Sequence, residues 1–67
     1  MSPLSPFQQR VVDEKKELDE RIVKLGAFLY SATFMSLPLA EVDRLAEQFS
    51  IMEEYSEILR KRIAAFT

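Results

Sequence analysis

Residues 42–66 read VDRLAEQFSIMEEYSEILRKRIAAF, and this stretch carries two separate helical patterns. The first is an apolar seam whose steps alternate between three and four residues: Val42, Leu45, Phe49, Met52, Ser56, Leu59, Ile63 and Phe66. Side chains at these steps share one face of an α-helix, which has about 3.6 residues per turn. Only Ser56 interrupts the apolar series, and its small side chain would permit a close helix crossing. We therefore predict a helix over residues 38–66.

A second stripe on the same predicted helix carries hydrogen-bonding groups. Gln48, Tyr55 and Arg62 follow one another at intervals of seven residues, and Ile51 and Ile58 lie between them. This alternation suits a partner surface better than bulk water, although half-exposed side chains that cover a neighbouring subunit would give the same pattern. Two paired helices need only one apolar seam, so the additional line of Ile51, Tyr55 and Ile58 predicts a homo-oligomer.

The first half of the chain predicts a helix over residues 6–30. Ser5 is a natural N-cap, and Pro6 suits the first helical position. The apolar stripe of this helix is Phe7, Val11, Leu18, Ile22, Leu25 and Leu29. Lys15 occupies a seam position, where we expect its stem to cover the core while its ammonium reaches solvent. Gly26 lies inside the helix, and we expect another helix to approach it closely.

Residues 31–37 have no helical periodicity and form the predicted connection. Phe34, Met35 and Leu37 are too apolar for a fully solvated loop, so we expect them to fold back over the end of the hairpin. Two long helices with a short connection fold as an antiparallel hairpin. The predicted fold is all-α, with one helical-hairpin domain over residues 1–67 that assembles into a homo-oligomeric helical bundle.

Composition narrows the functional classes. A chain of 67 residues is a marginal domain, and such chains gain stability by tight helix packing or oligomerisation. The sequence contains neither Cys nor His, so the commonest proton shuttle, the best nucleophile and the usual zinc ligands are all missing. One glycine is too few for a phosphate-binding loop. We predict a protein that is not an enzyme and has no metal or cofactor.

Charge and hydropathy limit the classes of partner that this protein can bind. A net charge of −2 argues against a binder of DNA or RNA, whose affinity comes from clustered Lys and Arg. No apolar run is long enough to span a membrane, so no membrane partner is predicted. Met1, Ser2 and the residues after them lack the pattern of a signal peptide, which favours a cytoplasmic location.

One end of the predicted hairpin gathers cationic and hydrogen-bonding residues. In a hairpin whose turn centres near Phe34, residues whose numbers sum to about 70 face one another. Arginine suits phosphate groups, tyrosine stacks on bases, and a helix N-terminus attracts anions. Together with Gln48 from the polar stripe, this end gives our candidate ligand-binding residues: Gln9, Arg10, Gln48, Tyr55, Lys61 and Arg62. The alternative is that the cations near the C-terminus only offset the helix dipole.

The sequence also resembles a family of very small phage and prophage proteins named after a short gene product of a crAss-like gut phage. The opening LSPFQQRVVDEK at residues 4–15 resembles the start of that family, and Glu17-Leu18, Lys24-Leu25 and Phe28 continue its pattern. The second half matches through Gln48, Met52, Tyr55, Leu59, Arg62 and Ile63. The resemblance implies a phage origin and action in the host bacterial cytoplasm, without a settled chemistry.

A looser analogy concerns small phage helical-hairpin oligomers that act as sponges for cyclic-nucleotide or cyclic-ADP-ribose-type immune signals. This chain is similar to them in size and architecture alone. The analogy implies a nucleotide-binding anti-defence protein that sequesters a host signal. Two alternatives remain: a protein-interaction module that binds a host or phage protein through Ile51, Tyr55 and Ile58, and a structural or assembly accessory.

Overall fold

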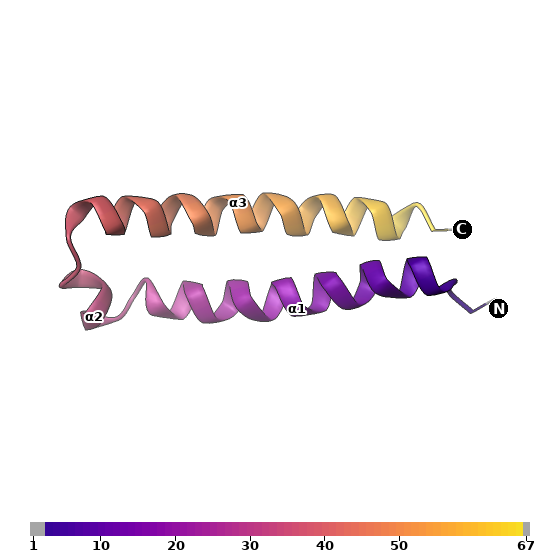
Figure 1. The fold of residues 1–67 in the computed structure, drawn as a ribbon, viewed down its shortest axis with the longest axis horizontal. Coiled ribbons are helices and arrows are strands. Elements are labelled where there is room, and N and C mark those ends of the chain that lie inside the picture. The colour runs from indigo at the N-terminus through magenta and orange to yellow at the C-terminus, as the bar shows by residue number, and fades with distance from the viewer. Residues whose placement is uncertain (1–2, 67) are drawn as a thin grey trace.

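The computed structural model describes residues 3–66 and contains three helices. Met1 and Ser2, with which the signal-peptide argument begins, lie outside this range, as does Thr67. Helices α1 (Pro6–Phe28), α2 (Ala32–Met35) and α3 (Leu39–Ala64) follow in that order. Figure 1 shows α1 and α3 side by side and antiparallel, with both ends of the described chain at the same end of a hairpin 51 Å long. The predicted all-α antiparallel hairpin is confirmed.

Helix α1 begins where the sequence predicts, at a capping box formed by Ser5 and Gln8. The Ser5 hydroxyl accepts a bond of 3.2 Å from the backbone N–H of Gln8, and the Gln8 side chain accepts one of 3.0 Å from the backbone N–H of Ser5. This reciprocal arrangement satisfies two backbone donors that a helix start leaves free. The helix ends at Phe28, two residues earlier than predicted. The backbone turns extended at Ser31, whose hydroxyl donates to the Phe28 carbonyl at 2.7 Å.

The connection contains a short helix that the sequence pattern did not predict. Ser31 caps α2 by accepting the backbone N–H of Phe34 at 3.1 Å. The Phe34 ring packs edge-on against Phe28, with ring centroids 6.0 Å apart, as expected of a residue that folds back over the end of the hairpin. The same expectation is wrong for Met35, which is 80% exposed. A four-residue helix presents its side chains in different directions, so the apolar residues of the connection cannot all turn inward.

The two predicted seams meet in the core. Val11, Leu18 and Leu59 are buried, and the partly buried apolar side chains around them are Ile22, Met52, Ile63 and Phe66. All seven come from the predicted apolar series. The close approach at Gly26 is also confirmed, because a Cβ built on this residue would lie 3.2 Å from Cε1 of Phe49.

The hairpin leaves more large apolar side chains exposed than it buries. Within residues 3–66 the exposed ones are Leu4, Phe7, Val23, Tyr30, Met35, Leu39, Ile51, Tyr55 and Ile58. A core of three buried apolar residues is small even for a chain of this length. Much apolar surface therefore stays free for contacts outside the hairpin.

Candidate functional site

The predicted stripe on α3 is at the surface of the hairpin. We call Gln48, Ile51, Tyr55, Ile58 and Arg62 the α3 stripe. Ile51 is 55% exposed, Ile58 54% and Tyr55 40%, and the residues at both ends of the stripe are exposed as well. A straight helix of this kind places the five side chains along one line about 20 Å long. The stripe is therefore accessible to a ligand or to a second protein surface.

Helix α1 orients two members of the α3 stripe through contacts across the hairpin. The hydroxyl of Tyr55 donates a hydrogen bond to the carboxylate of Glu14. The guanidinium carbon of Arg62 lies over the ring of Phe7, 5.9 Å from its centroid, in cation–π contact. These contacts orient Tyr55 toward Glu14 and Arg62 toward the exposed ring of Phe7. A guanidinium stacked on one aromatic ring, with a second aromatic side chain two turns away on the same stripe, offers one phosphate-binding group and aromatic faces for stacking.

Other predicted site residues make contacts within their own helix. Gln9 donates to the carboxylate of Asp13 at 3.0 Å, one turn further along α1. The amide of Gln48 lies 3.7 Å from the sulfur of Met52. Arg10 is exposed and lies three residues after Phe7 on α1.

Lys61 lies beside the α3 stripe, among acidic residues of the same helix. Lys61 lines a shallow hollow on α3 together with Glu53, Glu54, Glu57 and Ile58. Arg60 is bound to Glu57, with a closest contact of 2.6 Å. The hydrogen bond from Arg60 lowers the pKa of Glu57 and raises the pKa of Arg60 itself. The six candidate residues thus do not converge on one place in a single hairpin: Tyr55 and Arg62 share a side, whereas Lys61 turns toward acidic neighbours.

The N-terminus of α1 is less available as an anion site than the sequence suggests. The backbone N–H of Gln8 donates to the Ser5 side chain, and the backbone N–H of Ser5 donates to the Gln8 side chain at 3.0 Å. Two of the donors that would face an anion are therefore already satisfied by the cap.

A polar network that the sequence analysis missed lies in the seam between the helices. The ammonium of Lys15 donates to Asp19 at 2.7 Å and to the Ser56 hydroxyl at 3.0 Å, and that hydroxyl donates to Asp19. The Lys15 side chain is 23% exposed and that of Asp19 45%, so the network lies at the edge of the seam. The hydrogen bonds from Lys15 and then Ser56 lower the pKa of Asp19.

The sequence did contain a signal for this network. Lys15 and Ser56 are the only polar residues at core positions of the two seams, and an antiparallel pairing places them opposite one another. Two polar groups facing each other inside an apolar seam must bond to each other, because an unpaired one costs free energy.

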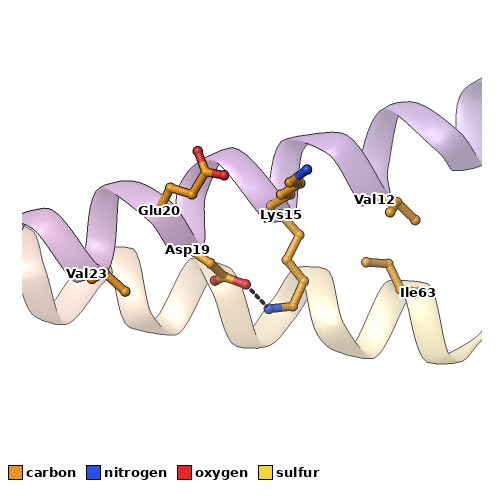
Figure 2. A pocket seen from close by; sticks show the side chains of 7 residues that line it. Val12, Lys15, Asp19, Glu20, Val23 and Ile63 are labelled. Atoms are coloured by element: carbon orange, nitrogen blue, oxygen red, sulfur yellow. Dashed lines mark hydrogen bonds and ion pairs between the residues drawn. The ribbon is translucent and has the colours of Figure 1, made fainter.

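A shallow apolar groove runs beside this network. It has a volume of about 450 Å³ and is lined by Val12, Lys15, Lys16, Asp19, Glu20, Val23 and Ile63. Figure 2 shows Val12 and Ile63 at one end, Val23 at the other, and the bonded Lys15 and Asp19 between them. Val12 and Glu14 are two residues apart and so project from opposite sides of α1. The groove therefore opens on the other side of the hairpin from the α3 stripe.

Two classes of site find no support in the part of the chain described. None of the helices within residues 3–66 has the length and apolar content needed to cross a membrane. The same residues contain no group of three or more acidic, His or Cys side chains placed to hold a metal ion.

The fold and its surface define a class of small helical hairpins with one mixed aromatic, aliphatic and cationic side. Residues 5–65 match the family model described as Sequestin, and the chain belongs to the Sequestin family. It is similar to the "Uncharacterized 7.5 kDa protein in denB-rIIB intergenic region" of Enterobacteria phage T4, with 42% identity over 60 residues, 90% of this chain and 94% of the relative. No solved structure matches the chain. The prediction of a small phage protein family is confirmed.

Proposed function

We propose that this protein is a phage-encoded anti-defence protein that sequesters a nucleotide-derived immune signal of the host, without catalysis. The ligand is a cyclic nucleotide or a cyclic-ADP-ribose-type molecule, bound in a pocket of a homo-oligomer in the host bacterial cytoplasm. The name of the Sequestin family suggests sequestration, which is a binding role and not a catalytic one. The similarity to a phage T4 protein supports a function during infection.

One observation carries the proposal: Arg62 lies over the aromatic ring of Phe7 at the surface. Phe7 lies beneath its guanidinium, and Tyr55 lies two turns before it on the same stripe. A guanidinium that stays exposed after this contact can still form the paired N–H bonds that phosphate oxygens accept. The aromatic rings supply faces for a base. These are the two halves of a nucleotide: a phosphate and a flat ring.

The need for an oligomer follows from the shape of this surface. Small-molecule sites enclose most of their ligand, but the side of a single two-helix hairpin is convex and open. A second subunit would close it and would bury Ile51 and Ile58, which are more than half exposed in one hairpin.

The test is calorimetric titration of the full chain with cyclic di- and trinucleotides and with cyclic ADP-ribose isomers. Arg62→Ala should abolish binding while helix content and oligomeric state stay unchanged. Arg60→Ala is the matched control, because Arg60 is two residues away and is bound to Glu57. It should keep wild-type affinity. An equal loss of affinity in both variants would indicate a general effect of positive charge. An absence of binding heat and of thermal shift with every compound would refute the proposal.

The second candidate is a helical module that binds a host or phage protein. The exposed pair of Ile51 and Ile58 favours it, because contiguous apolar side chains on a surface mark protein contacts. Under this alternative, Ile51→Ser would abolish capture of the partner, whereas Arg62→Ala would weaken it only slightly. The titration above separates the two, since a protein-interaction module gives no heat with the nucleotides.

A further inference from the structure

Two contacts across the hairpin lie one heptad apart. Arg62 lies over the ring of Phe7, and Tyr55 donates a hydrogen bond to Glu14. Phe7 and Glu14 are seven residues apart on α1, as are Tyr55 and Arg62 on α3. A spacing of seven residues keeps side chains on nearly the same face of a helix and corresponds to about 10 Å along its axis. The two contacts therefore form two levels on one side of the hairpin, about 10 Å apart.

The two levels carry opposite charge. The level of Phe7 and Arg62 is cationic, and the exposed Arg10 adds a positive charge three residues after Phe7. The level of Tyr55 holds the carboxylate of Glu14, which is also exposed. A phosphate group is attracted to a guanidinium and repelled by a carboxylate. A nucleotide on this side of the hairpin is thus oriented, with its phosphate at Arg62 and its base toward Tyr55.

The carboxylate of Glu14 retains hydrogen-bonding capacity beyond its contact with Tyr55. Its Oε2 accepts the tyrosine hydroxyl, whereas an ionised carboxylate offers about four acceptor positions and no donor. The contact places the carboxylate at the hydroxyl end of the Tyr55 ring. A base stacked on that ring therefore presents one edge to a group that only accepts hydrogen bonds.

This acceptor distinguishes the two purine bases. Guanine carries two neighbouring donors on its Watson–Crick edge, the N1–H and the N2 amine, and both can donate to one carboxylate. Adenine carries one donor on that edge, its N6 amine, beside an N1 that only accepts. In the same position, adenine would leave its N1 facing a carboxylate oxygen, and a mismatched polar contact of this kind costs affinity.

We infer that Glu14 is a specificity-determining residue that selects guanine in the proposed site. The base stacks on Tyr55 with its donor edge at Glu14, and the phosphate binds Arg62. The distance of about 10 Å between the two levels is comparable to the span of one nucleotide, from its phosphate to the far edge of its base. The inference rests on the proposed function and adds to it the class of ligand, a cyclic nucleotide that contains guanine.

A purely structural role for Glu14 gives a different result. In that role the carboxylate only holds the Tyr55 ring in place, so its loss would weaken the binding of every nucleotide alike. Selection of a base instead changes the ratio of two affinities. The measurement that separates the two roles is therefore the ratio of the affinities for two ligands that differ only in their bases.

The test is calorimetric titration of the full chain with cyclic di-GMP and cyclic di-AMP, which share one backbone. The wild-type protein should bind cyclic di-GMP more tightly, by about tenfold or more. Glu14→Gln should weaken the binding of cyclic di-GMP by a similar factor, because the amide group accepts with one atom only. The same variant should bind cyclic di-AMP at least as tightly as the wild type does, since glutamine pairs with adenine through two hydrogen bonds. The amide oxygen can still accept the Tyr55 hydroxyl, so the ring keeps its position.

Glu17→Gln is the matched control. Glu17 is exposed and lines a hollow formed by residues of α1 alone, among them Asp13 and Glu20. Its substitution removes the same charge three residues from Glu14 and should leave the ratio of the two affinities unchanged. An equal fall of this ratio in both variants would reduce the effect to charge and overturn the inference. Equal weakening of both ligands in Glu14→Gln would also overturn it, because that result belongs to a structural role.

The outcomes separate this inference from the proposed function. Equal affinity of the wild type for both compounds, or binding of cyclic ADP-ribose isomers alone, would refute the selection of guanine and leave the proposed function standing. A lack of binding by every nucleotide would refute the proposed function and this inference together.

Discussion

Gly26 is the single glycine of the chain, and its substitution sets a gain in helix propensity against a tighter contact with Phe49. Gly26→Ala removes a residue that costs about 1 kcal/mol inside a helix. The new methyl group would lie 3.2 Å from Cε1 and 3.6 Å from Cζ of Phe49, which is tight by a few tenths of an ångström. Phe49 is only half-buried, so its ring edge can move by that amount. We expect the backbone gain to prevail, with a net stabilisation of about 0.5 kcal/mol.

Larger side chains at the same position should reverse the sign. Gly26→Leu gains a similar helix propensity but places three more carbons against Phe49, and overpacking of this kind costs about 1–3 kcal/mol. A change of 1 kcal/mol shifts the melting temperature of a small domain by about 4–8 °C. Gly26→Ala should therefore melt about 2–4 °C above wild type. Gly26→Leu should melt below wild type.

The assay is thermal unfolding followed by circular dichroism, at one protein concentration for all variants. Ala27→Gly is the control for helix propensity, since Ala27 is exposed and its change should cost about 1 kcal/mol without altering a contact. A Gly26→Leu variant that melts at or above the wild-type temperature would refute the close approach of Phe49. A large loss of thermal stability in Gly26→Ala would show that the ring of Phe49 cannot move away from the added methyl group.

Three further outcomes follow from the fold. Leu59→Ala, at a fully buried position, should lower the free energy of unfolding in urea by about 2–5 kcal/mol, whereas Val23→Ala on the surface should change it by less than about 0.5 kcal/mol. The hydrogen bond from Lys15 holds the pKa of Asp19 below its ordinary value, so the stability from this carboxylate is full above that value and is lost as pH falls through the lower folded-state pKa. The free energy of unfolding of Asp19→Asn should therefore fall less than that of the wild type as the pH is lowered. A variant whose stability falls as much as that of the wild type would contradict the network. Ile58→Asp should dissociate the oligomer in sedimentation, because a charge would enter an apolar contact, and a wild-type monomer of 7.8 kDa at micromolar concentration would refute the oligomer.

The sequence by itself determined the two long helices and their pairing. Periodicity is a local property, so the two seams could be read directly, and each residue of the buried core belongs to one of them. The cap at Ser5 and the close approach at Gly26 were also predictable, since a helix start and an interior glycine each have a local physical cause. The site was predictable only as a set of residues on one stripe, because spacing along a helix fixes the face but not the neighbours.

Only the tertiary structure decided which polar groups meet across the hairpin. Tyr55 bonds to Glu14, Arg62 lies over Phe7, and Lys15 turns into the seam toward Ser56. Each contact joins residues about forty or more positions apart, so it depends on the rotation of one helix about its axis relative to the other, and on side-chain rotamers. A shift of one helix by a fraction of a turn would keep both apolar seams in contact and would change all of these partners. For this reason the periodic pattern specifies the core, whereas the geometry of the stripe follows from the packed pair of helices.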